Sequence, residues 1–163
     1  MRAEFPSLIR VEPLPGQRIH AAFSDGAEMT VELGDKIASL PALVALAEPA
    51  VFATASVGEY GHNLAFSIGE VFGADNVYAW GIEQRGETSH AMLWEWMHRN
   101  GLTQERAAEA IGISRRMLSY YLAAAKPIPK TVWLACLGFE AEQKRIGKRH
   151  AGKGSRASSR AAV

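Results

Sequence analysis

The sequence predicts a mixed protein, in which a small α+β N-terminal domain is joined to an all-α C-terminal helix-turn-helix domain. Three observations predict this. The first half contains short runs with period-two alternation and Gly/Pro turns, which is typical of a small antiparallel sheet with short helices. The second half has helical spacing with cap residues. The charge also divides between the halves. The 163 residues suffice for two small domains.

The charge division is sharp. Residues 1–87 hold five Lys/Arg against twelve Asp/Glu, a net −7, whereas residues 88–163 hold thirteen against five, a net +8. Such asymmetry indicates two modules with different partners and makes the basic one the candidate for a polyanion. We place the domains at 1–81 and 90–142, with 82–89 as a polar linker. Residues 143–163, with seven Lys/Arg and no acid, are predicted to be a flexible basic tail.

In the N-terminal half, a hairpin is the clearest element. Residues 18–23 and 27–33 flank Ser24-Asp25-Gly26, where Asp-Gly supplies the positive φ of a tight turn. The other predicted elements are a strand from Ile9, a helix over 36–47 with Pro41 near its first turn, a helical turn leading into a strand over 51–56, a strand over 63–68 and a short helix over 71–80.

A family resemblance accompanies these patterns. The hairpin reads PLPG-x-R-(x)4-FSDG-(x)4-VEL, and it is followed by LAEPAVFATASV and VFGADNVYAW. Residues 7–80 therefore resemble the bacterial domain of unknown function 2442 (DUF2442). Such domains are similar to partners in toxin-antitoxin-like gene pairs, which implies a protein partner or an effector for this half and gives no chemistry.

The C-terminal half predicts helices with defined caps. Thr88 or Ser89 caps a helix over 90–99 that buries Leu93 and Trp96. Thr103 caps a helix over 104–111 that carries small residues at Ala107 and Ala108. Gly112 makes a sharp turn, and Ser114 caps a helix over 115–122. A fourth helix, about 130–141, begins after Pro129 and is apolar nearly all round.

These positions resemble the repressor-like helix-turn-helix family of bacteria and phages, of the Xre and lambda-repressor type. Gln104 opens the motif, Ala108 makes the close helix crossing, Gly112 makes the turn and Leu118 is the buried aliphatic residue. The runs WGIEQRGETSHAMLWEWMHRNGLT, AAEAIGISRRMLSYY and WLACLGFE are further similar to bacterial proteins that join a DUF2442-like domain to such a domain. Together the resemblances cover about residues 7–142.

The resemblance implies which residues face DNA. A helix in the major groove presents its first residues to base edges, which selects Arg115, Arg116 and Ser119. Arg115 is the best reader of guanine, although either arginine could hold only a phosphate. Tyr120 either reaches the DNA or packs on the first helix, and Gln104 could brace Arg115. The expected phosphate and backbone contacts are Thr103, Gln104, Ser114, Tyr120, Lys126 and Lys130.

We therefore predict a cytoplasmic, sequence-specific transcriptional regulator that binds double-stranded DNA. The alternative is an antitoxin-like protein-binding module whose helix-turn-helix serves autoregulation. The fourth helix is more apolar than one small core requires, and either the acidic module of the same chain or a second copy could cover the excess. We expect a homodimer, because repressor-like domains usually read two half-sites as dimers. Cys136 lies in an apolar run and is expected to be a buried thiol. No HxH, HxxxH or CxxC spacing occurs, so we expect no metal and no cofactor. No stretch approaches the ~20 uninterrupted apolar residues of a membrane span, so none is expected. We also expect no enzyme activity, whether through Cys136, His98 or the N-terminal set of His20, His62, Asp25 and Asp75.

Overall fold

Two small antiparallel sheets form the N-terminal part of the chain. The structure is a computed structural model that describes the fold of residues 4–160 and the side chains of residues 4–152. The first sheet has the order β1-β2-β3 and the second the order β4-β5-β6. Their strands are β1 (Leu8–Leu14), β2 (Arg18–Phe23), β3 (Glu28–Glu32), β4 (Ser56–Val57), β5 (Asn63–Phe66) and β6 (Gly69–Gly73). Together with the helices described below, the sheets confirm a mixed α+β fold.

The predicted hairpin is present as β2 and β3. Ala21 lies opposite Met29 in its register, and both side chains are buried. Gly26 has φ 90° in the turn, and the Asp25 carboxylate accepts a hydrogen bond of 2.9 Å from the amide of Ala27. The Asp-Gly pair therefore closes the turn by the mechanism that its sequence predicts.

Two predicted helices of this half are wrong in their extent. The helix over 36–47 is divided into α1 (Gly34–Ala38) and a 3₁₀ helix, η1 (Pro41–Ala47), because Leu40 before the proline is extended, at φ −123° and ψ 110°. The short helix over 71–80 is preceded by strand β6 and begins only at Ala74. A single turn, α2 (Pro49–Phe52), leads into β4 as expected, and η2 (Glu59–Gly61) precedes β5.

Helix α3 (Ala74–Gln84) lies directly on β3. A Cβ atom at Gly81 would collide with the side chains of Met29 and Val31, so glycine permits the close approach. The Gln84 side chain bonds both the amide and the carbonyl of Glu32, at 2.8 and 2.9 Å. Helix α3 therefore ends three residues beyond residue 81, where the first domain is predicted to end, and extends into the predicted linker.

Four helices form the C-terminal part: α4 (His90–Arg99), α5 (Gln104–Ile111), α6 (Arg115–Leu122) and α7 (Lys130–Arg160). The first three have the predicted bounds. The fourth differs, because α7 continues through residues predicted to be a flexible tail. No proline interrupts residues 130–160, Lys, Arg, Gln and Ala are good helix formers, and Glu142 pairs with Arg145 at 3.0 Å one turn on. Residues 161–163 of the predicted tail lie outside the described residues.

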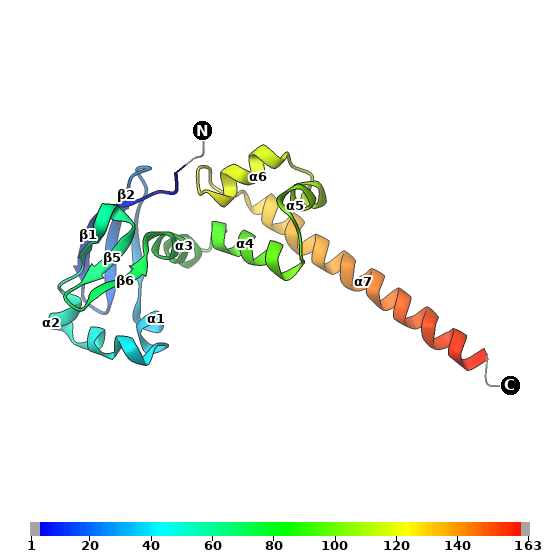
Figure 1. Cartoon of the computed structure of the whole chain (residues 1–163), viewed down its shortest axis with the longest axis horizontal. Coiled ribbons are helices and arrows are strands. Elements are labelled where there is room, and N and C mark those ends of the chain that lie inside the picture. The colour runs from blue at the N-terminus through cyan, green and yellow to red at the C-terminus, as the bar shows by residue number, and fades with distance from the viewer. Residues whose placement is uncertain (1–3, 161–163) are drawn as a thin grey trace.

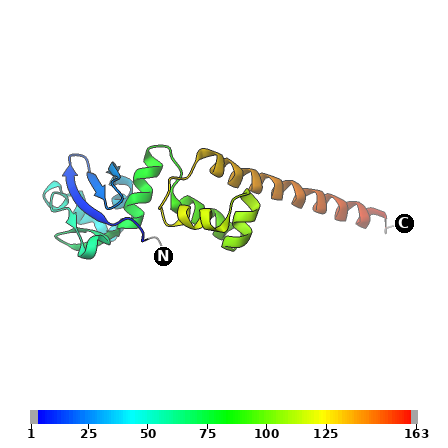
Figure 2. The ribbon, with the colours of Figure 1, turned by 90° about the horizontal axis from the view of Figure 1, so that it is seen from above.

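The elements follow one another along an elongated molecule. Figure 1 shows the two sheets at one end, α4, α5 and α6 in the middle, and the long α7 reaching away to the other end, and Figure 2 gives the same order from above. Within residues 4–160, none of the helices is both long and apolar enough to cross a membrane.

The buried apolar side chains form two clusters. One lies between the sheets and α3, and the other lies among α4, α5, α6 and α7. Between them, the Ser89 hydroxyl donates to Glu83 at 2.6 Å and accepts from the amide of Met92 at 3.1 Å, so it caps α4 and ties it to α3. The Phe5 ring contacts His90 at 4.5 Å between centroids. Polar and aromatic contacts thus hold the region where the two clusters meet.

Candidate nucleic-acid interface

The turn between α5 and α6 has the geometry that its sequence predicts. Gly112 ends α5 with φ 74° and ψ 31°, the left-handed conformation that favours glycine. Each helix has a side-chain cap, since Thr103 accepts from the amide of Arg106 at 3.3 Å and Ser114 from that of Met117 at 3.1 Å. Both hydroxyls therefore serve first as caps, and their own hydrogens are left to donate to another acceptor.

The buried faces of α5 and α6 determine which residues are left outside. Ala107 and Ala108 of α5 and Leu118 and Leu122 of α6 are buried in the second cluster. The small side chains on α5 allow the two helices to cross closely. The residues predicted to contact bases, Arg115, Arg116 and Ser119, are all exposed along α6.

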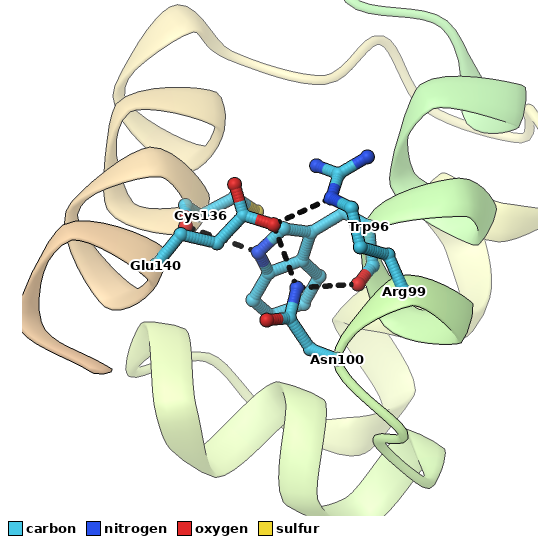
Figure 3. A network of polar contacts seen from close by, with 5 residues as sticks. All are labelled: Trp96, Arg99, Asn100, Cys136 and Glu140. Atoms are coloured by element: carbon cyan, nitrogen blue, oxygen red, sulfur yellow. Dashed lines mark hydrogen bonds and ion pairs between the residues drawn. The ribbon is translucent and has the colours of Figure 1, made fainter. Parts of the chain in front are cut away.

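A polar network joins α4 to α7 (Figure 3). These two helices pack against α6 and α5. Buried Trp96 donates from its indole to the carbonyl of Cys136 at 3.0 Å. Glu140 accepts from Arg99 at 2.6 Å and from Asn100 at 2.8 Å. These bonds keep the pKa of the Glu140 carboxyl below its usual range, chiefly through Arg99. Burial raises the pKa of the Cys136 thiol to about 11, which agrees with the expected inert thiol.

Arg115 is paired within the helix-turn-helix itself. Its guanidinium lies 3.1 Å from a carboxylate oxygen of Glu105, the second residue of α5. The side chains are 63% and 74% exposed, so the pair lies in solvent and contributes little stability. The sequence suggested that Gln104 could brace Arg115, but the structure assigns that contact to Glu105.

Tyr120 brings two cations together, an arrangement that the sequence did not predict. The Arg116 Nε donates to the Tyr120 hydroxyl at 2.9 Å, and its guanidinium lies 5.6 Å from the ring centroid. The Lys126 ammonium lies 5.1 Å from the same centroid. The i,i+4 spacing of Arg116 and Tyr120 on a helix is the signal that would have indicated this contact. We call Arg116, Tyr120 and Lys126 the Tyr120 cluster.

Three exposed cations on and after α6 are held by neighbouring side chains. Arg115 is held by a carboxylate, and the Tyr120 cluster holds Arg116 and Lys126 beside an aromatic ring. Lys130, the first residue of α7, is exposed, and Gln104 at the start of α5 is half-buried. The start of α6 also carries the positive end of the helix dipole. This combination of capping hydroxyls and exposed cations is chemically suited to phosphate and base-edge acceptors.

Comparison with solved structures reveals a relative. A crystal structure of a protein from Nitrosomonas europaea ATCC 19718, described as a "Putative DNA Binding Protein", is similar over 86% of this chain and 91% of that one. The TM-score is 0.79 and the sequence identity is 47%. This chain belongs to the family of that protein. No model of a known protein family matches the sequence, and no curated protein matches it. The resemblances to DUF2442 and to the repressor-like family therefore stay predictions.

The likeness to the Nitrosomonas protein extends beyond the helix-turn-helix. A match over 86% of the chain extends well beyond α5 and α6. The family therefore has the mixed α+β arrangement, and the α5–α6 pair is only one part of it.

The N-terminal part also has titratable side chains in polar contacts. Among the residues whose side chains are described, no group of three or more His, Cys, Asp and Glu could hold a metal ion. Asp25 accepts from the Tyr78 hydroxyl at 2.7 Å, and burial is the largest cause of the raised pKa of that phenol. His20 lies 3.8 Å from Glu28 on the surface of the first sheet. The bond between Tyr78 and Asp25 joins α3 to the turn between β2 and β3, whereas His20 and Glu28 lie within the first sheet.

Proposed function

We propose that this chain is a sequence-specific DNA-binding transcriptional regulator that inserts α6 into the major groove. The observation that carries the proposal is the α5–α6 pair, with two capped helices, a left-handed glycine turn and cations on the exposed side of α6. The description of the Nitrosomonas protein agrees with a DNA-binding role. The net +8 of residues 88–163 favours the same partner.

We assign base reading to Arg115. A bidentate contact with guanine is worth about 1–3 kcal/mol of discrimination. Giving up an exposed ion pair such as that with Glu105 costs about 0.2–1 kcal/mol. The contact with guanine therefore outweighs the pair, and Arg115 is free to turn toward a base. Ser119, one turn along α6 and exposed, is the second candidate for base contact.

The Tyr120 cluster is assigned to the phosphate backbone. Two cations on one aromatic ring form a positively charged patch, which suits the regular charge of a DNA strand better than one base edge. Gln104, Thr103, Ser114 and Lys130 add donors at the starts of α5, α6 and α7. In this arrangement phosphate contacts set the register, and Arg115 supplies sequence preference.

The proposal includes two domains and a homodimer. The separate clusters of buried residues support a DNA-binding unit at 90–142 and a sheet unit at 1–81. Leu134 and Leu137 of α7 are exposed, whereas Cys136 of the same helix is buried. A second copy seated there would cover them and present two α6 helices to two half-sites. Light scattering at micromolar concentration tests this, and a monomeric mass would contradict the dimer.

Selection of bound sequences from a random duplex pool tests the proposed function. We expect one enriched sequence, and Arg115→Ala should lower affinity for it by about 1–3 kcal/mol and relax one base position. Arg116→Ala and Lys126→Ala should weaken all sequences alike and reduce the salt slope by about 0.9 for each phosphate that is no longer neutralised. Arg10→Ala, which removes an exposed arginine of the first sheet, is the matched control. A pool without enrichment would refute sequence-specific binding.

A further inference from the structure

A wide cavity lies where the sheet part meets the helical part. It has a volume of about 1000 Å³, at the upper end of what small-molecule sites show. Its walls come from the segment before β1, the η2 turn, the start of α3, the start of α4 and the last residue of α6. A ligand in this cavity would therefore touch both clusters at once.

Apart from the imidazoles of His62 and His90 and the phenol of Tyr60, the ionisable side chains that line the cavity are carboxylates. Glu4, Asp75 and Glu95 line it, and no lysine or arginine does. None of the three carboxylates takes part in an ion pair with another side chain of residues 4–152. Elsewhere, exposed carboxylates such as Glu28 and Glu105 have arginine partners. The cavity therefore offers three carboxylates that no described side chain holds in an ion pair, although the Asp75 carboxylate accepts a hydrogen bond of 2.8 Å from the amide of Asn76.

Aromatic rings supply the second feature. Phe5, Tyr60 and Trp94 line the cavity, and the latter two are 81% and 45% exposed. Tyr60 has φ 54° although it is not glycine, so the η2 turn presents its ring from an unfavourable backbone conformation. Aromatic faces attract organic cations, which combine a positive charge with an apolar body.

The floor of the cavity includes His90, the first residue of α4. Burial lowers the pKa of this imidazole, so near neutral pH it is uncharged and adds no positive charge to the cavity. Its Nδ1 is buried without a hydrogen-bond partner among the described residues. Leu122, the last residue of α6, lines the same space.

The lining of the cavity indicates the class of ligand. In the described part of the chain, the acids and histidines do not form a group of three that could hold a metal ion. Three carboxylates and three aromatic rings that line one wide cavity suit a longer molecule with more than one cationic centre. We propose that this cavity binds a small organic di- or polyammonium ion, with its ammonium groups at Asp75, Glu95 and Glu4 and its aliphatic body against Tyr60 and Trp94.

Binding at this place has a structural consequence. The ligand would connect the start of α3 with the start of α4 and the end of α6, and so fix the helix-turn-helix relative to the sheets. Only this coupling to DNA binding rests on the proposed function, since ammonium binding needs no DNA. Its test can therefore succeed or fail independently of the DNA experiment.

Calorimetric titration of the full chain with spermidine, and with putrescine as the shorter diamine, tests the proposal without DNA. We expect saturable binding of spermidine and a rise of the thermal midpoint on its addition. Asp75→Asn and Glu95→Gln should each weaken binding about threefold to fivefold, because each removes one partly exposed charge. Glu48→Gln, an exposed carboxylate outside the cavity, is the matched control and should leave the affinity unchanged.

Three outcomes would overturn the proposal. One is the absence of saturable binding of either amine to the unchanged protein. Another is binding that Glu48→Gln weakens as much as Glu95→Gln does, because the amine would then be attracted only by the overall negative charge of the sheet part. The third is a basic peptide that binds where the free amines do not, which would assign the cavity to a protein partner. Each variant is checked for an unchanged far-UV spectrum, and Asp75→Asn and Glu95→Gln test the cavity from two different helices.

Discussion

Replacing Glu105 by glutamine should strengthen DNA binding, although it removes an interaction that the free protein makes. Glu105 holds Arg115 at 3.1 Å, and both side chains are exposed. The substitution removes the charge of the partner and keeps its size, so Arg115 no longer has to leave an ion pair before it reaches a base. It also removes a negative charge that lies beside the proposed path of the phosphates.

The expected gain in DNA affinity follows from the exposure of the ion pair between Glu105 and Arg115. An exposed ion pair contributes about 0.2–1 kcal/mol, and one charge about 10 Å from a phosphate in water contributes about 0.4 kcal/mol before screening by salt. Together these predict a dissociation constant lower by about twofold to tenfold at low salt. The gain should shrink as salt is added, since both contributions are screened.

Fluorescence anisotropy with a labelled duplex at several salt concentrations measures this effect. Glu109→Gln is the matched control, because Glu109 is exposed one turn further along α5 and has no ion-pair partner among the described side chains. The gain in DNA affinity from Glu109→Gln should be smaller, because this substitution removes only a negative charge. If Glu105→Gln weakened binding, Glu105 would have to hold Arg115 in the bound state too, and the reasoning would be refuted.

Three further predictions concern the helical part. Trp96→Phe should lower the free energy of unfolding by about 2–3 kcal/mol, because it removes a buried hydrogen bond and leaves a cavity, whereas exposed Trp94→Phe should change it by less than about 0.5 kcal/mol in urea denaturation. Cys136 should resist thiol reagents at pH 8 until the protein unfolds, and labelling of the native protein would contradict its burial. Glu140→Gln should lower the thermal midpoint at pH 7. Because the folded pKa of Glu140 is depressed, that difference should vanish as the pH falls through it, and a constant difference would argue against the ion pair with Arg99.

The sequence predicts local elements well where the deciding residues are adjacent. The caps Thr103 and Ser114 and the glycine at 112 define α5 and α6 to the residue, and Asp25-Gly26 defines the hairpin. Caps and left-handed glycines act on backbone groups that are close in sequence, so the local sequence pattern is enough to predict where these helices begin and end.

Elements that depend on distant contacts are predicted less well. The extent of α3 depends on the pairing of Gln84 with Glu32, 52 residues away in sequence. Residues 36–47 are divided into two helices because Leu40, which precedes Pro41, is extended. The apolar spacing of the segment does not indicate this break. The apolar spacing ends before residue 143, so it could not indicate that α7 continues.

The candidate site shows the same distinction. Exposure of Arg115, Arg116 and Ser119 follows from helix periodicity, and the structure confirms it. The partners of the arginines do not follow from it. Glu105 reaches Arg115 across the turn, and Lys126 reaches Tyr120 from the segment after α6, so both contacts depend on how α5, α6 and the next loop pack.

Helix α7 joins two very different environments in one continuous element. Its 31 residues span about 46 Å. Among the residues whose side chains are described, only the first third of α7 packs into the second cluster, and residues 141–152 are exposed without exception. An unsupported helix of this length is marginal in water. In native-state hydrogen exchange, the amides of residues 134–140 should therefore open only when the second cluster unfolds, while those of residues 144–150 should exchange by fraying. Protection from hydrogen exchange should therefore decline from turn to turn along α7. The residue at which it falls marks the end of tertiary packing, beyond which only helix propensity stabilises the helix.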